Sequence, residues 1–247
     1  MSDAFVVVGG DAAGMSAASK ARRENPAREI VVFERGDWVS YGACGLPYYI
    51  KGDIESLEDL VSVTASEFRE DRNIDLRTGH EVVAIDTVTK TVTVEGPDGQ
   101  FEQEYGDLLI ATGASSIVPP IDGIERAGGY TLHDMADGRA IRQRLEEPGG
   151  PESVGIVGGG YVGIEMAEAF RDRGLEVHLF EMLPHVLDPF GEAVGERVET
   201  ELRDQGVEVH LETAVEGFDG DASIEAIRIP EGSVPVDMAL VGVGVKP

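Results

Sequence analysis

The sequence of 247 residues contains a single cysteine, Cys44, and few histidines. One cysteine excludes an internal disulfide framework. The five histidines are scattered along the chain, at His80, His133, His178, His185 and His210. No cysteine and histidine pair has the spacing of a zinc site. We therefore predict no metal site and interpret the histidines as structural.

Positive charge is also scarce. The chain has 20 lysine and arginine residues against 47 aspartate and glutamate residues, which gives a formal net charge of -27. A charge of this size repels nucleic acids and anionic membranes, so we expect neither as a partner. The acidic residues are spread along the whole chain, which predicts a halophilic protein, adapted to very high salt.

Long hydrophobic runs are missing as well. No apolar run approaches the length of a membrane span. Met1–Ala4 leads directly into an apolar strand, without the basic region and hydrophobic core of a signal peptide. These absences favour a cytoplasmic protein. The length is sufficient for one or two domains with a sizeable core.

Two βαβ patterns are present. The first has an apolar strand at Ala4–Val8, a glycine turn, a helix at Met15–Asn25 and a strand at Ile30–Glu34. Three alternating segments follow and predict a small antiparallel meander, at Glu81–Ile85, Thr91–Glu95 and Phe101–Glu104. A buried strand is expected at Leu108–Ala111.

The second βαβ pattern repeats the first. It has a strand at Val154–Val157, a glycine turn, a helix at Ile164–Arg173 and a strand at Glu176–Glu181. The fold class is therefore α/β, with two Rossmann-like domains of the three-layer ββα type and the meander in the first. We place the domains at residues 1–115 and 116–247.

The second glycine turn is Gly158-x-Gly160-x-x-Gly163 and lies between a strand and a helix. Its glycines allow a tight turn, the approach of a pyrophosphate and close packing of helix on strand. Glu181 lies 18 residues after Gly163, where an acid can bond both ribose hydroxyls. No arginine or lysine occurs in 182–190 to neutralise a 2'-phosphate, which favours NADH over NADPH.

The first turn departs from this pattern. Gly9 and Gly14 fit the outer positions, but Asp11 replaces the middle glycine. Glu34 lies 20 residues after Gly14, at the end of the next strand. The pattern indicates a second dinucleotide site. The alternative is a structural turn in which Asp11 caps the helix.

The segment Ser40–Tyr49 contains Cys44. Pro47 is suited to the first turn of a helix. A thiol just ahead of that turn would face the positive end of the helix dipole, which stabilises the thiolate and makes the sulfur a nucleophile. The alternative is that Cys44 is a small buried hydrophobe.

Five motifs together resemble the pyridine nucleotide-disulfide oxidoreductases, and within them the single-cysteine branch that contains coenzyme A disulfide reductases and NADH oxidases. The motifs are Gly9-Gly10-x-Ala12-Ala13-Gly14-Met15-Ser16-Ala17-Ala18, Ser40-Tyr41-x-x-Cys44-Gly45-Leu46-Pro47-Tyr48, Leu108-Leu109-Ile110-Ala111-Thr112-Gly113, Gly158-x-Gly160-x-x-Gly163 and Gly242-x-Gly244-x-x-Pro247. The dithiol members need a second cysteine, so the chain is not one of them.

The resemblance implies two cofactors. FAD would contact Gly9, Gly10, Asp11, Ala12, Ala13, Gly14, Glu34, Arg35, Val82, Ala111, Thr112 and Gly113. NAD(P)H would contact Gly158, Gly159, Gly160, Tyr161, Val162, Gly163, Glu181 and Gly242. Tyr161 would be the aromatic lid over the nicotinamide site. The alternative is that Tyr161 is an aromatic packed in the core.

The resemblance also implies a mechanism. Hydride would pass from NADH to the flavin, and electrons would pass on to a disulfide at the catalytic Cys44, which in a coenzyme A disulfide reductase is mixed with coenzyme A. The substrate contacts would be Lys20, Arg23, Ser40, Ala43 and Arg72. From charge pattern alone, the basic residues near the end of the first helix are equally well explained as a solvated face.

Three departures from the branch limit this reading. Ala43 stands where the branch usually has asparagine, which puts the thiol substrate in doubt. Ala12 stands where peroxidases and many oxidases of the branch carry histidine, which weakens those two functions. Family members also continue beyond a sequence like Val241–Pro247, so the chain resembles the first half of a longer, homodimeric protein.

The leading hypothesis is an FAD-dependent NAD(P)H oxidoreductase that reduces disulfides or persulfides of coenzyme A. A second hypothesis is an NADH oxidase that reduces oxygen through a sulfenic acid at Cys44. A third is a nucleotide-binding fragment without catalytic activity.

Overall fold

The computed structural model describes residues 2–247, which form two compact units. One unit contains the chain up to Gly42 together with Glu58–Gly113 and Pro247, and the other contains Ala43–Leu57 and Ala114–Lys246. The sequence-based division after residue 115 assigned Ala43–Leu57 to the first domain, whereas this segment packs with the second unit. The nucleotide that each unit binds stays a prediction.

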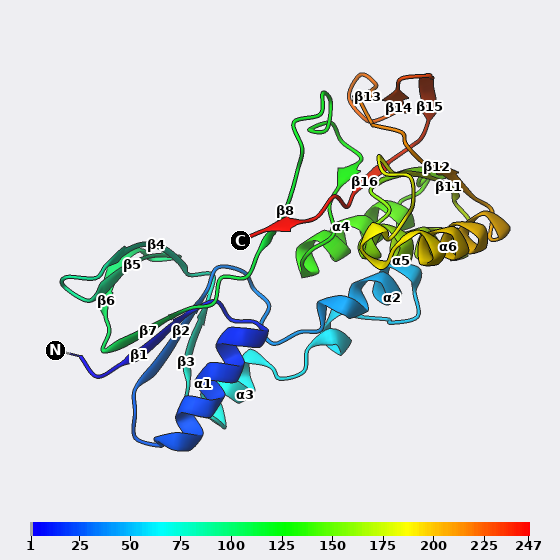
Figure 1. The fold of residues 1–247 in the computed structure, drawn as a ribbon. Helices are drawn as coiled ribbons and strands as arrows, with labels where there is room; N and C mark the ends of the chain where they lie inside the picture. The colour runs from blue at the N-terminus through cyan, green and yellow to red at the C-terminus, as the bar shows by residue number, and fades with distance from the viewer. Residues whose placement is uncertain (1) are drawn as a thin grey trace. The chain divides into compact units, whose positions relative to one another are not determined.

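The first unit is built on a parallel sheet with the strand order β3-β2-β1-β7 (Figure 1). Its strands are Phe5–Val8 (β1), Ile30–Glu34 (β2), Asp75–Thr78 (β3) and Asp107–Ile110 (β7). Strands β1 and β2 are apolar along nearly their whole length because both faces of the sheet are covered. The predicted βαβ unit is confirmed.

Helices cover one face of this sheet. Helix α1, Ala12–Glu24, connects β1 to β2, and helix α3 spans Ala65–Glu70. A capping box of Thr64 and Glu67 starts α3 by satisfying two free N–H groups. The core between sheet and helices contains Val7, Met15, Ala18, Ile30, Val32, Phe68, Ile74 and Leu76.

The predicted antiparallel meander covers the other face and is confirmed. Its strands are Glu81–Asp86 (β4), Thr91–Gly96 (β5) and Gly99–Glu104 (β6). Val92 and Val94 alternate inward along β5, as the period of two predicts, and pack on the sheet. The first unit therefore has three layers.

The second unit repeats this design around a sheet with the order β12-β11-β10-β16-β9, all parallel. The strands are Gly129–Tyr130 (β9), Ser153–Val157 (β10), Glu176–Phe180 (β11), Val207–His210 (β12) and Ala239–Val241 (β16). The longer helices are Met135–Glu146 (α4), Tyr161–Asp172 (α5) and Glu192–Asp204 (α6). The second βαβ unit, β10-α5-β11, is confirmed.

A second antiparallel meander, which the sequence did not predict, belongs to this unit. It consists of Gly217–Asp219 (β13), Ala226–Ile229 (β14) and Gly232–Pro235 (β15). Phe218 and Ile227 pack against Phe180 of β11 in a shared core. A short antiparallel pair, Ser115–Ser116 (β8) with Val245–Lys246 (β17), completes the unit.

Helix α2, Leu46–Lys51, follows a 3-10 turn at Ala43–Gly45 and has a proline in its first turn, as predicted. It packs closely on α4. The absence of a side chain at Gly138 permits this approach, since a Cβ there would lie only 2.7 Å from Leu46 Cδ2. Hydrogen bonds from Lys51 to Asp172 and Glu168 of α5 raise the pKa of the lysine. Other 3-10 turns are Leu57–Leu60 and Asp188–Phe190.

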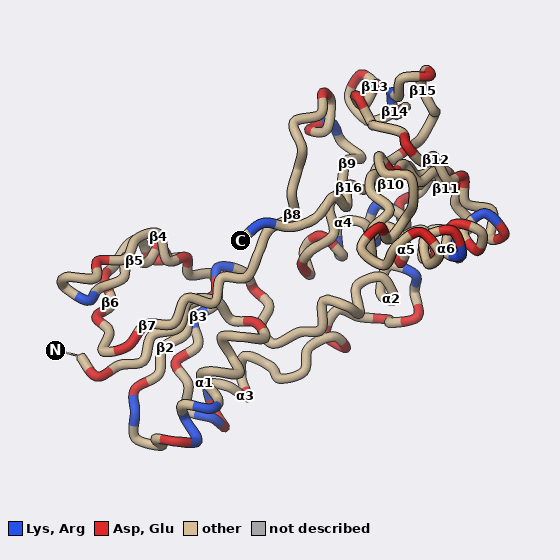
Figure 2. The backbone as a smooth tube through the Cα atoms, viewed as in Figure 1, with Lys and Arg blue, Asp and Glu red and all other residues tan. Residues whose placement is uncertain are grey.

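Acidic residues occur on helices, strands and loops of both units (Figure 2). This distribution agrees with the even spread along the sequence. No helix within residues 2–247 is both long enough and apolar enough to cross a membrane.

Candidate functional site

The glycine turn of the second unit has the geometry of a dinucleotide loop. Gly158 has φ +108°, and a Cβ there would lie 2.6 Å from the carbonyl oxygen of Gly242. A Cβ at Gly163 would lie 2.0 Å from the Gly158 oxygen, so only glycine lets α5 approach the loop this closely. A Cβ at Gly160 would meet nothing within 4 Å. That open space fits a phosphate at the start of a helix.

Glu181 lies directly after β11 and bonds to the loop. Its Oε2 accepts a hydrogen bond from Gly159 N at 2.7 Å, and its Oε1 accepts one from Leu183 N at 2.8 Å. A carboxylate has about four lone-pair positions, so each oxygen keeps one for a ribose hydroxyl. The backbone therefore holds this acid in place at the loop.

Tyr161 and Phe190 form an exposed aromatic pair beside the same loop. Tyr161 is the first residue of α5, and its ring meets that of Phe190 edge to face with 5.6 Å between centroids. Tyr161 is 62% exposed and Phe190 is 51% exposed, so the reading of Tyr161 as a core aromatic is wrong. Val162 beside it is half-buried.

The first unit holds its acid in the same manner. Glu34 Oε2 accepts from Gly10 N, and Oε1 accepts from Gly36 N, both at 2.7 Å. Gly9 has φ +110°, and a Cβ there would lie 2.2 Å from the Ala111 oxygen. A Cβ at Gly14 would lie 1.9 Å from the Gly9 oxygen. The outer glycines of both turns are therefore required by the same close contacts.

Asp11 does not cap the helix, which corrects one of the two readings of this residue. It immediately precedes α1, but its side chain makes no hydrogen bond to the helix. Instead its Oδ1 accepts a hydrogen bond from Tyr41 N at 3.1 Å. The Asp11 carboxylate therefore anchors the chain at Tyr41, three residues before Cys44.

Ser40 is held by its backbone on both sides. Its N–H donates to the Gly10 oxygen at 3.1 Å, and its own oxygen accepts from Ser62 N at 2.8 Å. These bonds hold Ser40 at φ +50°, a left-handed conformation that is uncommon for residues other than glycine. The anchoring of Ser40 and the Asp11 bond together define the path of the chain up to Tyr41.

The remaining predicted FAD residues all lie in the first unit. Ala111 follows β7, and its N–H donates to the Val8 oxygen at 2.8 Å. Val82 is half-buried in β4 beside a break in its strand register. The other predicted residues are exposed, namely Ala12, Ala13, Arg35, Thr112 and Gly113.

Cys44 is exposed. The interpretation of this cysteine as a buried hydrophobe is therefore wrong. It lies in the 3-10 turn before α2, next to the exposed Ala43, and both residues belong to the second unit. The thiol is therefore accessible to a soluble reactant.

The predicted substrate residues are divided between the units. Lys20, Arg23, Ser40 and Arg72 lie in the first unit and Ala43 lies in the second. Lys20 is exposed and forms an ion pair with Glu24 at 2.5 Å. Arg72 donates to Ser19 Oγ at 3.1 Å, and its Cζ lies 4.8 Å from the centre of the Phe68 ring.

Sequence reasoning missed the contacts that Asp11 and Phe190 make. Asp11 bonds to a residue 30 positions away, and Phe190 meets Tyr161 from a loop. No local pattern marked these contacts: Ser40 and Leu187 both lie six residues after the acid of their loop, but they are different residue types. Both sixth residues turn out to be left-handed.

The fold and the paired glycine turns define a protein with two dinucleotide-binding folds. The profile of the family described as pyridine nucleotide-disulphide oxidoreductase matches residues 3–247. The chain belongs to this family.

Two curated relatives and one solved structure illustrate the similarity. An NADH oxidase of Methanocaldococcus jannaschii is 35% identical over 98% of this chain and 54% of its own length. The NAD(P)H coenzyme A polysulfide/persulfide reductase of Pyrococcus horikoshii is 35% identical over 100% of this chain and 55% of its own. Reduced CoADR-RHD of Bacillus anthracis has a TM-score of 0.95 and 34% identity over 100% of this chain and 44% of its own. The chain spans about half the length of the curated relatives it matches.

Proposed function

We propose that the protein acts in an FAD-dependent NAD(P)H oxidoreductase that reduces a disulfide or persulfide of the coenzyme A class at Cys44. The observation that carries this proposal is the exposed thiol of Cys44 in a chain with two dinucleotide loops. The family and the relative from Pyrococcus horikoshii support the reaction class.

The residues of both loops fit the two nucleotides. The space at Gly160 accommodates a pyrophosphate, and Glu34 and Glu181 each keep lone pairs for a ribose. The absence of lysine and arginine in 182–190 favours NADH over NADPH. Tyr161 would cover the nicotinamide, with Phe190 supporting its ring. Bound FAD would supply a ring system that accepts a hydride and passes on its two electrons.

Cys44 would be the catalytic residue. Its thiolate would attack one sulfur of the substrate disulfide, the other sulfur would leave as a thiolate, and a mixed disulfide between Cys44 and coenzyme A would remain. Two electrons and a proton then release coenzyme A and restore the Cys44 thiolate. Ala43 beside it carries no polar side chain, so the substrate would be oriented by other groups.

Basic side chains of the first unit would bind the phosphates of coenzyme A. Lys20 and Arg23 lie three residues apart on α1 and therefore share a face of that helix. Arg72 is held in a fixed orientation by Ser19 and Phe68. Ser40 would contribute at the end of the anchored segment, and the active assembly would be a homodimer of the whole protein.

The substitution Cys44→Ser tests the central role. We expect it to abolish NADH-dependent reduction of coenzyme A disulfide, because serine cannot form the mixed disulfide. It should leave electron transfer from NADH to an artificial dye intact. Because the chain has no other cysteine, one substitution removes every thiol. Disulfide reduction at the wild-type rate would remove Cys44 from the mechanism.

Oxygen reduction is the second candidate function. It is favoured by the similarity to the NADH oxidase of Methanocaldococcus jannaschii. In this case Cys44 would cycle through a sulfenic acid. Oxygen uptake equal to NADH consumption, with no thiol substrate present, would select this function. Ala12 argues against it, since many oxidases of the branch carry histidine there.

We also propose that the protein works in a cytoplasm of high salt concentration. The net charge of -27 and the acidic residues on both units support this proposal (Figure 2). Molar salt screens the repulsion among these charges. The melting temperature should rise between low and molar KCl, and a constant or falling melting temperature would refute salt adaptation.

A further inference from the structure

Two neighbouring strands bring together side chains that can bind a metal ion. His178 of β11 pairs with Glu208 of β12, and His210 lies two residues further along β12. Alternate residues of a strand share a face, so all three side chains lie on the same face of the sheet. Their ligand atoms lie within 4.8 Å of one another. The spacing of these residues along the sequence does not indicate a metal site, because the pairing of β11 with β12 brings them together.

The distances fit a first-row metal ion. His178 Nδ1 lies 3.2 Å from Glu208 Oε2 and 3.4 Å from His210 Nε2. Ligands bound tetrahedrally to zinc at 2.0–2.2 Å are separated by about 3.3–3.6 Å. The third side of the triangle, from His210 Nε2 to Glu208 Oε2, is 4.0 Å. The Glu208 side chain is 63% exposed, so it is free to close this gap of about half an ångström.

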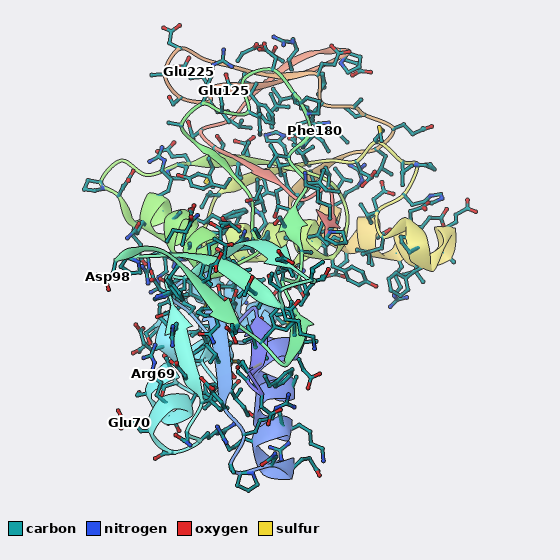
Figure 3. The ribbon with its side chains drawn as sticks, turned by 90° about the vertical axis from the view of Figure 1, so that its left-hand side faces the viewer. Arg69, Glu70, Asp98, Glu125, Phe180 and Glu225 are labelled. Atoms are coloured by element: carbon teal, nitrogen blue, oxygen red, sulfur yellow. The ribbon has the colours of Figure 1, made fainter. Side chains whose placement is uncertain are left out.

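The two imidazole rings are held in orientations suited to ligation. His178 is buried, and its Nε2 lies 3.4 Å from Glu176 Oε1. The Glu176 carboxylate lies on the Nε2 side of the ring, so Nδ1 is the nitrogen that faces Glu208 and His210. The His210 ring stacks on Phe180 at 4.6 Å between centroids, and Phe180 itself is anchored in the core of the second unit (Figure 3). Both rings therefore lose little freedom on binding.

We propose that His178, Glu208 and His210 bind a divalent transition metal ion of the zinc class, with water in the remaining position. Two imidazoles and one carboxylate suit zinc, nickel or copper rather than magnesium or calcium. The ion would link the edge strand β12 to β11. The His210 oxygen accepts a hydrogen bond from Glu181 N at 2.9 Å, so the link would also steady the acid of the second glycine loop.

Zinc titration of the full chain tests the proposal. The experiment uses chelator-treated protein carrying Cys44→Ser, so that the thiol does not bind zinc, and molar KCl, which screens weak binding by surface carboxylates. Calorimetry should show one tight zinc ion per chain, and zinc should raise the melting temperature. Absence of a stoichiometric site would overturn the proposal.

Ligand variants locate the site. His210→Gln and Glu208→Gln should each weaken zinc binding at least about tenfold, while His133→Gln, a histidine of the same unit outside the cluster, should bind like the parent. Glu208→Gln changes an exposed side chain, so it gives an answer even if His210→Gln fails to fold. Equal affinity in Glu208→Gln and the parent, or an equal loss in His133→Gln, would refute the assignment.

Discussion

The two glycine loops hold their acidic residues by the same bonds. Gly10 N donates to Glu34 Oε2 and Gly159 N donates to Glu181 Oε2, both at 2.7 Å. The correspondence extends to the loops that follow, where Ser40 and Leu187 are both left-handed, at φ +50° and +51°. Ser40 N donates to the Gly10 oxygen at 3.1 Å, and Leu187 N donates to the Gly159 oxygen at 2.9 Å. Serine and leucine therefore adopt the same backbone conformation at this position of the two units.

The loops differ at their middle position. Gly160 leaves open space, whereas Asp11 reaches Tyr41 N. After its left-handed residue, the second unit continues into a turn with the exposed Phe190, while the first continues toward Cys44. One side chain in an otherwise repeated scaffold therefore connects the first loop to the cysteine segment.

The largest expected effect comes from substituting the last glycine of each loop. A Cβ would lie 1.9 Å from a carbonyl oxygen at Gly14 and 2.0 Å at Gly163. Gly14→Ala and Gly163→Ala should each cost about 2–3 kcal/mol of unfolding free energy, because helix and loop must separate. Denaturant unfolding measures this cost.

Nucleotide binding adds a second readout for the same variants. Gly14→Ala should lose FAD and keep NADH binding, and Gly163→Ala should do the reverse. Ser16→Ala, at an exposed position on α1, is the control. If both variants lost both nucleotides, the prediction that the two loops bind FAD and NADH independently would be wrong.

Substitution of Glu34 and Glu181 should have the next largest effect, on nucleotide affinity. Glu34→Gln should weaken FAD binding and Glu181→Gln should weaken NADH binding, each by about 10- to 100-fold, because bonds to a charged acceptor contribute about 1.5–3 kcal/mol. Flavin content and NADH titration measure the two affinities. Glu192→Gln, an exposed acid on α6, should match wild type. NADH affinity unchanged in Glu181→Gln would remove this acid from the site.

Ser40 tests the left-handed position. Ser40→Val should lower the unfolding free energy by about 1–2 kcal/mol, because a β-branched residue is strained at φ +50°. Ser40→Gly should stay within about 0.5 kcal/mol of wild type, because relief of strain offsets the greater freedom of glycine in the unfolded chain. Equal stability of the two variants would show that the segment adopts another conformation.

The smallest effect is expected at Asp11. Asp11→Ala should cost about 1 kcal/mol, since it removes the acceptor for Tyr41 N. Asp11→Asn keeps an oxygen at that position and should lie close to wild type. Alkylation of Cys44 should change rate in Asp11→Ala only. Identical alkylation rates in wild type, Asp11→Ala and Asp11→Asn would show that the bond from Tyr41 to Asp11 does not affect the reactivity of Cys44.

The elements found from sequence alone are those whose signal is local. The alternation around Val92 and Val94 predicted the first meander, and the strand-glycine-helix pattern predicted both loops. The second meander was not predicted, because its first strand, Gly217–Asp219, is too short to show an alternation of apolar and polar residues. The packing of Ala43–Leu57 with the second unit also escaped, since it depends on contacts with helices far along the chain.

The glycine spacing and the acids Glu34 and Glu181 are readable in the chain because a tight turn and a strand end impose their requirements within a few residues. The partner of Asp11, the exposure of Cys44 and the meeting of His178 with His210 became visible only in the folded protein. Each depends on which distant segments become neighbours. Strand pairing and packing determine which distant segments become neighbours, and no local sequence pattern predicts these contacts.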